Sequence, residues 1–289
     1  MPAFNPVALI GRQNGHKSTE LVNALGQFLT ERGCEVLVEK TTAEVNGVDR
    51  FASADYAGIG ERARLAVVLG GDGSMLHAAR HLAAYRVPLV GVNQGRLGFM
   101  TDIAQTKMLE AMAELLEGRF STEDRTMLSA QVLRDDRPVL SAIALNDIVV
   151  SKGTVGRLIE FLVHIDGEFV YDLRSDGLIV ATATGSTAYA LSSNGPILHP
   201  AVPGIVLVPI SPHTLSNRPI AVSDAARIEL TLRHALDAQL HFDGQPQFEL
   251  VAGDRVAISR SEHSIRFVHP PGYSYFAMLR EKLHWSEMY

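Results

Sequence analysis

The sequence has a single cysteine, Cys34, and a single tryptophan among its 289 residues. One cysteine cannot form a disulfide within the chain, which indicates a reducing compartment, and we expect a cytoplasmic protein. No apolar run approaches the length of a membrane span. The N-terminus also lacks the charged stretch and long apolar stretch of a signal peptide. We therefore expect no membrane partner.

An excess of positive charge is also missing. Lys and Arg number 26 against 32 Asp and Glu, which gives a formal net charge of −6 at pH 7. Such a chain has no global basic field for nucleic acid or for an anionic membrane, so we expect no nucleic-acid partner. Any ligand that carries phosphate must be held by local arginines, by backbone dipoles or through a metal ion.

The first part of the chain alternates short apolar runs with helical patterns. The run Leu65 to Leu69 is typical of a buried parallel strand, and the apolar spacing from Met75 to Leu82 predicts a helix after it. This alternation predicts a Rossmann-like α/β domain over residues 1–122, although a Gly-x-Gly-x-x-Gly fingerprint is absent. Residues 41–60 show no sustained periodicity and predict a loop or a short helix.

The pattern changes after Arg125, where many short strands separated by turn residues are expected. Residues 127–134 and 139–150 read as paired strands, and Asp166-Gly167 has the chemistry of a hairpin turn. We predict a β-rich, β-sandwich-like domain over residues 123–270. Residues 271–289 are compatible with a helix, and we expect this tail to pack back on the N-terminal domain.

One turn combines three glycines with a carboxylate, in the order Gly70-Gly71-Asp72-Gly73. It lies where the strand 65–69 ends and a helix begins, at the edge of a parallel sheet where ligands bind. Free N–H groups at such a turn attract anions, but Asp72 would repel a phosphate. Asp72 is therefore a candidate base for a hydroxyl that attacks a phosphate. It could equally be the N-cap of the next helix.

Three further segments carry polar groups at strand ends. Residues 174–189 form a strand followed by a small-residue loop rich in hydroxyls, which could approach a flat polar ligand or simply be a well-capped turn. Asn146-Asp147 could hold ribose hydroxyls, or form an Asx turn. Asp243-Gly244-Gln245 could be no more than a hairpin tip.

Together these segments resemble the bacterial NAD kinase family over roughly residues 6–270. The resemblance rests on the Gly-Gly-Asp-Gly turn at 70–73, on Asn146-Asp147, on the glycine-rich segment 174–198 and on Asp243-Gly244-Gln245. Residues 91–99 and 215–219 also match in order and approximate spacing. The segment 174–198 makes the resemblance narrow, because Gly-Gly-Asp-Gly also occurs in phosphofructokinases and lipid kinases. Asp147 stands where many members have Glu.

The resemblance implies a kinase that transfers the terminal phosphoryl group of ATP to the adenosine ribose 2′-hydroxyl of NAD, which gives NADP. Asp72 would be the catalytic base. The residues that it implies for NAD binding are Asp72, Gly73, His77, Asn146, Asp147, Arg157, Arg174, Asp176, Thr187, Ala188, Tyr189, Ala190, Leu191, Ser192 and Gln245. A divalent cation, Mg²⁺, is expected to arrive with ATP, and its protein ligands are unknown. The family also implies a homo-oligomer, a dimer or a tetramer.

Two other functions compete with this one. A lipid kinase of the diacylglycerol type would share Gly-Gly-Asp-Gly, but should lack the loop at residues 184–189 and show a membrane-facing surface. A sensor that binds NAD(H) or NADPH without catalysis would use the same pocket. The sequence favours the enzyme, because Asp72 in an anion-binding turn is unfavourable for binding alone.

Overall fold

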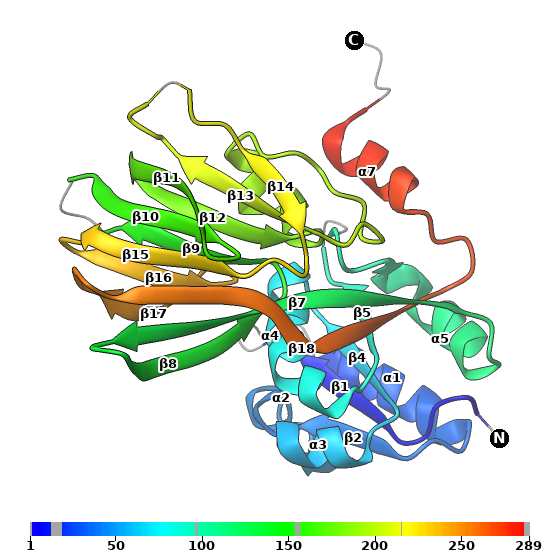
Figure 1. The fold of residues 1–289 in the computed structure, drawn as a ribbon. Helices are drawn as coiled ribbons and strands as arrows, with labels where there is room; N and C mark the ends of the chain where they lie inside the picture. The colour runs from blue at the N-terminus through cyan, green and yellow to red at the C-terminus, as the bar shows by residue number, and fades with distance from the viewer. Residues whose placement is uncertain (1, 13–18, 96–97, 154–156, 215, 286–289) are drawn as a thin grey trace. The chain divides into compact units, whose positions relative to one another are not determined.

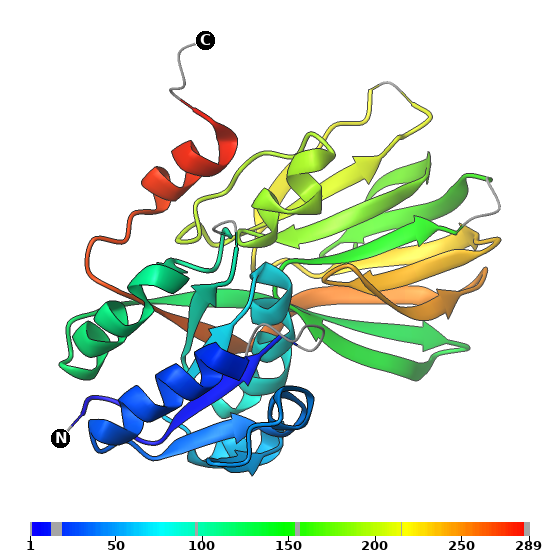
Figure 2. The ribbon, with the colours of Figure 1, turned by 180° about the vertical axis from the view of Figure 1, so that it is seen from behind.

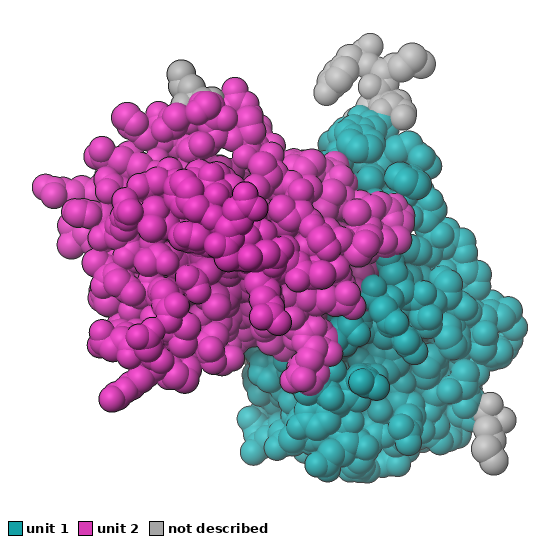
Figure 3. Space-filling model, in the orientation of Figure 1, with its two compact units in different colours: residues 1–124, 264–289 teal, residues 125–263 magenta. Residues whose placement is uncertain are grey.

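The structure is a computed structural model that describes residues 2–12, 19–95, 98–153, 157–214 and 216–285. The chain forms two compact units, residues 1–124 with 264–289 and residues 125–263 (Figure 3). Both boundaries fall inside long strands, β7 (Ser121–Arg134) and β18 (Arg255–His269). The C-terminal segment therefore belongs to the same unit as the N-terminus.

The first unit is built on a parallel sheet in the order β3-β2-β1-β4-β5. The end of β18 pairs with β5 in parallel, with Phe267 opposite Leu89, and β6 pairs with β5 as well. The strands are β1 (Val7–Gly11), β2 (Val36–Glu39), β3 (Ala52–Ala54), β4 (Leu65–Leu69), β5 (Leu89–Asn93) and β6 (Ile103–Ala104). This order, with helices between strands, confirms the Rossmann-like prediction.

Helices cover this parallel sheet (Figure 1), and Figure 2 shows α1 lying along β1 on one face of the sheet. The α-helices are α1 (Thr19–Glu31), α2 (Lys40–Asn46), α3 (Tyr56–Arg62), α4 (Asp72–Leu82), α5 (Met108–Leu116) and α7 (Tyr275–Leu283). Two 3₁₀ turns, η1 (Ala83–Tyr85) and η2 (Gln105–Lys107), complete the unit. No helix among the described residues is long and apolar enough to cross a membrane.

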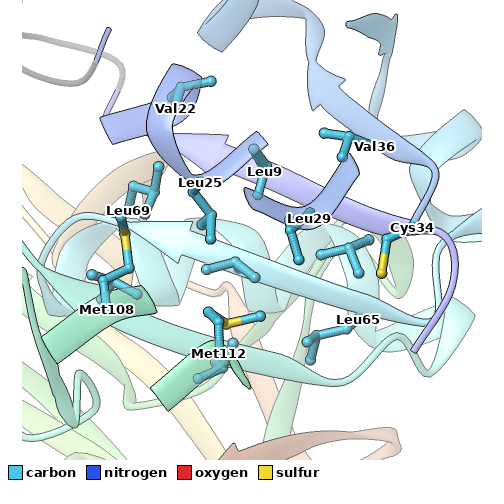
Figure 4. Packing of buried hydrophobic residues seen from close by; sticks show 14 of the residues in the cluster. Leu9, Val22, Leu25, Leu29, Cys34, Val36, Leu65, Leu69, Met108 and Met112 are labelled. Carbon is cyan, nitrogen blue, oxygen red and sulfur yellow. The ribbon is translucent and has the colours of Figure 1, made fainter. Parts of the chain in front are cut away.

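The core of the first unit lies between the sheet and the helices α1 and α5 (Figure 4). Leu9 of β1, Leu25 of α1 and Met112 of α5 are fully buried in it. Burying a leucine side chain of this kind stabilises a fold by about 1.5–3 kcal/mol. Ala66 and Val68 point to the opposite face of β4 and are also fully buried. The sheet is therefore covered on both faces, as its continuous apolar strands indicate.

The segment predicted as a loop or a short helix, residues 41–60, does contain short helices, but it also contains a strand that was not expected. It contains two short helices, α2 and α3, and the three-residue strand β3, which pairs with β2 at the edge of the sheet. The strand has the sequence Ala-Ser-Ala, and none of its residues is buried. Since an exposed edge strand buries no apolar face, it leaves no period-2 pattern to detect.

The second unit contains two antiparallel sheets. One joins β10, β11, β15, β7, β8 and the first part of β18, and the other has the order β14-β13-β12-β9-β16-β17. The strands not yet given are β8 (Arg137–Ala144), β9 (Asp147–Lys152), β10 (Ile159–Ile165), β11 (Glu168–Ser175), β12 (Gly177–Thr182), β13 (Gly204–Ile210), β14 (Ile220–Ser223), β15 (Ile228–His234), β16 (Ala238–Phe242) and β17 (Gln245–Leu250). Two short helices, η3 (Gly185–Thr187) and α6 (Tyr189–Ser192), follow β12.

Side chains from both sheets form one core in this unit. Phe161 of β10 and Phe242 of β16 lie in the same buried cluster, together with Val180 of β12. Such packing of two antiparallel sheets confirms the predicted β-rich, sandwich-like architecture. The expected strand over 139–150 was wrong as one element, because the chain leaves β8 at Ala144 and begins β9, in the other sheet, at Asp147. The strand end expected at Asn146-Asp147 agrees with the end of β8. The crossing at Leu145-Asn146 brings polar groups to the start of a buried strand.

Candidate functional site

Asp72 begins α4, directly after β4. The N-cap of this helix is Gly71, which makes no side-chain capping bond. The Asp72 carboxylate instead accepts hydrogen bonds from the backbone N–H groups of Phe99, at 2.8 Å, and Met100, at 3.0 Å. The alternative of an N-cap at Asp72 was therefore wrong. The side chain links the start of α4, which follows β4, to the chain that follows β5.

The chain after β5 is folded closely onto this carboxylate. A Cβ atom at Gly98 would collide with the Asp72 carboxylate and with Thr101 Oγ1. Thr101 Oγ1 accepts from the Gly98 N–H and from Asn93 Nδ2, each at 3.0 Å. A carboxylate offers about four acceptor positions. The two backbone bonds therefore leave Asp72 able to accept a further proton donor.

Nothing among the described residues requires Gly71 and Gly73 to be glycine. Gly71 has a φ of −103°, and Gly73 is not among the glycines with positive φ. A Cβ atom added at either position would meet no described atom within 4 Å. Both residues are exposed. The missing side chains keep open the space beside Asp72 at the N-terminus of α4, where a helix attracts anions.

His77 lies in α4 and forms an aromatic cluster with His81 and Tyr56. The ring centroids of Tyr56 and His81 are 4.4 Å apart, as are those of His77 and His81. Burial, together with the neighbouring charges of His81 and Arg80, lowers the pKa of His77 to about 4. His77 is therefore uncharged at neutral pH. It can offer a hydrogen bond to a phosphate, but no positive charge.

In the second unit, Asn146 and Asp147 lie where β9 begins. Both are buried, with exposed fractions of 8% and 3%. Thr182 donates from its N–H to the Asn146 carbonyl, at 2.9 Å, and from its hydroxyl to the Leu145 carbonyl, at 2.6 Å. On the other side, the Asp243 carboxylate accepts from the N–H groups of Leu145, Asn146 and Asp147, at 3.2, 2.7 and 3.3 Å. The backbone of these three residues is thus held from both sides.

These residues open onto a cavity of about 420 Å³, which we call the Asp147 cavity. It is lined by Asn146, Asp147, Val149, Ser151, Ala188, Tyr189, His241, Asp243 and Gly244. Asn146 Oδ1 is buried and has no hydrogen-bond partner among the described residues. Tyr189 is 46% exposed and places an aromatic ring beside these polar groups. An unsatisfied amide next to an exposed ring is suited to a flat ligand with polar edges.

The carboxyl group of Asp147 is strongly perturbed. Burial and, to a smaller extent, the charge of Asp243 raise its pKa to about 7. Burial also lowers the pKa of His241, whose Nε2 is 3.1 Å from Ser151 Oγ. A buried carboxyl that titrates near neutral pH in a cavity marks a candidate site. Bound hydroxyl or amine donors would favour its charged form.

The remaining residues implied by the resemblance do not line this cavity. Arg157 is exposed, Arg174 lies 3.3 Å from Glu160, and Asp176 forms an ion pair with Lys152 at 2.7 Å. Thr187 ends η3, Gln245 is an exposed residue at the start of β17, and Ala190, Leu191 and Ser192 belong to α6. Their roles stay predictions. Two matched segments fall partly outside the described residues, at positions 96–97 and 215.

The sequence did not indicate that the Asp243 carboxylate holds the backbone of residues 145–147. Its turn was recognised as a possible hairpin tip, and Asp243 and Gly244 do connect β16 and β17 with φ values of 51° and 74°. The turn contacts residues 145–147, almost one hundred positions earlier, and such a distant contact leaves no pattern in the sequence around the turn. The Asp-Gly pair alone indicates a turn, whatever its neighbours.

The described residues contain no group of three or more His, Cys, Asp or Glu side chains that could hold a metal ion. This arrangement fits a metal that is held mainly by the phosphates of a nucleotide, as Mg²⁺ commonly is.

Comparisons with known proteins agree on one family. Residues 7–120 match the ATP-NAD kinase N-terminal domain, and residues 145–270 match the ATP-NAD kinase C-terminal domain. An NAD kinase of Aromatoleum aromaticum is 55% identical over 284 residues, which cover 98% of this chain and 95% of that protein.

Solved structures give the same result. Yeast NADH kinase in complex with NADH has a TM-score of 0.88 at 27% identity, and the match covers 100% of this chain and 90% of that one. An NAD kinase from Archaeoglobus fulgidus in complex with ATP has a TM-score of 0.76 at 26% identity, and covers 96% of this chain and 98% of that one. The chain therefore belongs to the NAD kinase family, as its glycine-aspartate turn and its long glycine-rich segment indicate.

Proposed function

We propose that this protein phosphorylates the 2′-hydroxyl of the adenosine ribose of NAD with ATP and releases NADP and ADP. The observation that carries this proposal is the geometry of Asp72. Two backbone N–H groups hold its carboxylate at a helix N-terminus, and Gly71 and Gly73 keep the adjoining space open. An acceptor next to an anion-binding turn suits a hydroxyl that attacks a phosphate.

In this reaction the ribose hydroxyl donates a hydrogen bond to a free lone pair of Asp72. As its oxygen bonds to the terminal phosphorus of ATP, the bond between that phosphorus and the bridging oxygen breaks, and ADP leaves. The proton of the hydroxyl passes to the Asp72 carboxylate. A Mg²⁺ ion arriving with the triphosphate would supply positive charge to neutralise the donor oxygens. The protein contributes mainly the position of the base and the dipoles of the turn.

The Asp147 cavity is proposed to bind the dinucleotide. Asn146 Oδ1 lacks a partner there, and the Asp147 carboxylate has no hydrogen bond among the described residues, so both can accept from amine or hydroxyl groups of NAD. Tyr189 offers a ring for stacking against a base. Arg157, Arg174, Asp176, Gln245 and the segment Thr187 to Ser192 are proposed to contribute further contacts.

We also propose a cytoplasmic homo-oligomer, a dimer or a tetramer. Cys34 is free and buried, which suits a reducing compartment. The edge strand β11 exposes Phe169 and Val170, with exposed fractions of 55% and 37%, and such a strand is suited to pairing with another copy. Light scattering after size-exclusion chromatography tests this proposal. A mass equal to the 31.4 kDa of one chain at micromolar concentration would contradict it.

The activity is tested by incubating the purified protein with NAD and Mg-ATP and assaying NADP with an NADP-specific dehydrogenase. Parallel reactions with NADH as acceptor and with inorganic polyphosphate as donor define the substrate range. NADP that forms only with NAD, donor and protein together supports the proposal. Tight NAD binding without any NADP would instead support a sensor.

A further inference from the structure

We propose that Asp243 is a positioning residue for NAD: it fixes the backbone of residues 145–147, so that the Asn146 amide and the Asp147 carboxylate face the Asp147 cavity. This inference rests on the proposed function of that cavity and adds to it a residue that does not itself need to touch NAD. It begins from the hydrogen bonds that Asp243 makes.

All six backbone polar groups of residues 145–147 are bonded. Asp243 supplies four of these bonds: its carboxylate accepts from the three N–H groups, and its own N–H donates to the Asp147 carbonyl at 3.0 Å. Thr182 supplies the other two, to the carbonyls of Leu145 and Asn146. With the main chain fixed, the two side chains are the only groups here that remain to meet a ligand. Such preorganisation lowers the entropy lost on binding.

The turn itself does not require this carboxylate. Both turn residues have positive φ, a conformation that asparagine and glycine adopt as readily as aspartate. The chain contains a second turn of the same kind, Asp166-Gly167 between β10 and β11, with φ values of 52° and 83°. There the aspartate is exposed and accepts from the Arg227 N–H at 2.9 Å. Only at Asp243 are both oxygens bonded to a polar segment that lines a cavity.

The position of Asp243 also has an electrostatic cost. The titratable groups that line the cavity are Asp147, Asp243, His241 and Tyr189, and none of them carries a positive charge at neutral pH. Asp243 is 9% exposed, and its charge helps to raise the pKa of Asp147. If residue 243 served only to stabilise the turn, a carboxylate would be unfavourable here. Its charge repels that of Asp147, and this repulsion is strong at low dielectric.

The test compares Asp243→Asn with the matched control Asp166→Asn. Both changes remove one negative charge from an Asp-Gly turn, but only the first removes an acceptor from residues 145–147. We expect Asp243→Asn to weaken NAD binding about tenfold, as measured by calorimetry, and to raise the NAD KM to a similar extent. The turnover number at saturating NAD should stay within about twofold of the original. The control should change neither value.

A second readout separates positioning from a general loss of stability. With carbon-13 label in aspartate carboxyl groups, the Asp147 signal is identified by its disappearance in Asp147→Asn. In Asp243→Asn its titration midpoint should move to lower pH, because a neighbouring negative charge is gone. In Asp166→Asn the midpoint should not move.

Two results would overturn the proposal: NAD affinity in Asp243→Asn that equals that of the control, or an equal loss of affinity in both variants. If Asp243→Asn does not fold, Asp243→Gly and Asp166→Gly repeat the comparison with a residue that suits the turn. If the proposed function itself is wrong, the experiments give a different result. In that case the unaltered protein makes no NADP, whereas the NMR titration still reports whether Asp243 acts on Asp147.

Discussion

Asp72 shows how one side chain serves both structure and chemistry. Its carboxylate accepts from Phe99 and Met100, which ties the chain after β5 to the start of α4. The same contacts orient the side chain without occupying all its acceptor positions. Any substitution at Asp72 therefore removes the proposed base and also changes the bonds that hold the loop at Phe99 and Met100. A control that changes only this loop is needed.

We predict that Asp72→Asn keeps the fold and NAD binding but lowers the turnover number roughly 10²- to 10⁴-fold, because an amide cannot take the proton. Thr101→Val is the control: it removes the acceptor of the Gly98 N–H and loosens the same loop without touching Asp72. Steady-state kinetics with NADP detection measures both variants. Similar losses in the two variants would assign the effect to the loop.

Asp147 gives a prediction about stability. Its pKa is raised from 3.8 to about 7 in the folded protein, so its ionisation destabilises the fold as pH rises from 3.8 through 7. We predict that Asp147→Asn raises the free energy of unfolding by about 1–3 kcal/mol at pH 8 and binds NAD more weakly. The gain should disappear below pH 4. Urea denaturation at several pH values measures it, and a gain that does not vary with pH would contradict this origin.

Among the elements, the C-terminal segment is held to its unit by a buried histidine. His269, at the end of β18, is 3% exposed and hydrogen-bonds the Asp102 carboxylate through Nδ1. The ring of Tyr273 stacks on it with centroids 3.7 Å apart, and Glu123 lies 3.5 Å from Nε2. Burial alone would lower the pKa of His269, but the hydrogen bond to Asp102 and the charges of Asp102 and Glu123 outweigh it and raise the pKa. The protonated histidine therefore stabilises the packing of the end of β18 and of Tyr273, two residues before α7 begins.

This arrangement predicts that α7 becomes easier to open in alkaline solution. Because the pKa of His269 is raised on folding, its stabilising contribution is complete below pH 6.5 and is lost as pH rises through the raised value. Hydrogen exchange of the amides of Tyr275–Leu283 should be faster at pH 9 than at pH 6, after correction for intrinsic rates. In Asp102→Asn this difference should be much smaller. Equal pH dependence in both proteins would be evidence against the ion pair.

For the molecule as a whole, the described residues provide no cluster of ligands for a metal ion. If the metal arrives with ATP, its removal should stop the reaction and leave the fold intact. We predict that EDTA abolishes NADP formation but changes the thermal unfolding midpoint by less than about 2 °C. Excess Mg²⁺ with ATP should restore activity. A large fall of the midpoint in EDTA would instead indicate a structural metal.

The sequence by itself determined that an α/β region is followed by a β-rich region, and it determined the family. The continuous apolar run Leu65 to Leu69, the helical spacing after it and the Asp-Gly turns are local patterns, and local patterns reflect burial and turn geometry directly. The exposed strand β3 and the break between β8 and β9 at Leu145-Asn146 are marked only weakly by the pattern of apolar residues in the sequence. The expectation of one continuous strand over 139–150 failed because its two halves are both apolar, although they belong to different sheets.

Only the tertiary structure decided which of the candidate groups meet within each unit. Asp72 bonds the Phe99 N–H, 27 residues away, and Asp243 bonds the Asn146 N–H, 97 residues away. Neither bond follows from periodicity, because hydrogen bonds between distant segments depend on how strands are ordered in the sheets. The raised pKa of Asp147 has the same origin, since burial and a neighbouring charge exist only once these strands have come together.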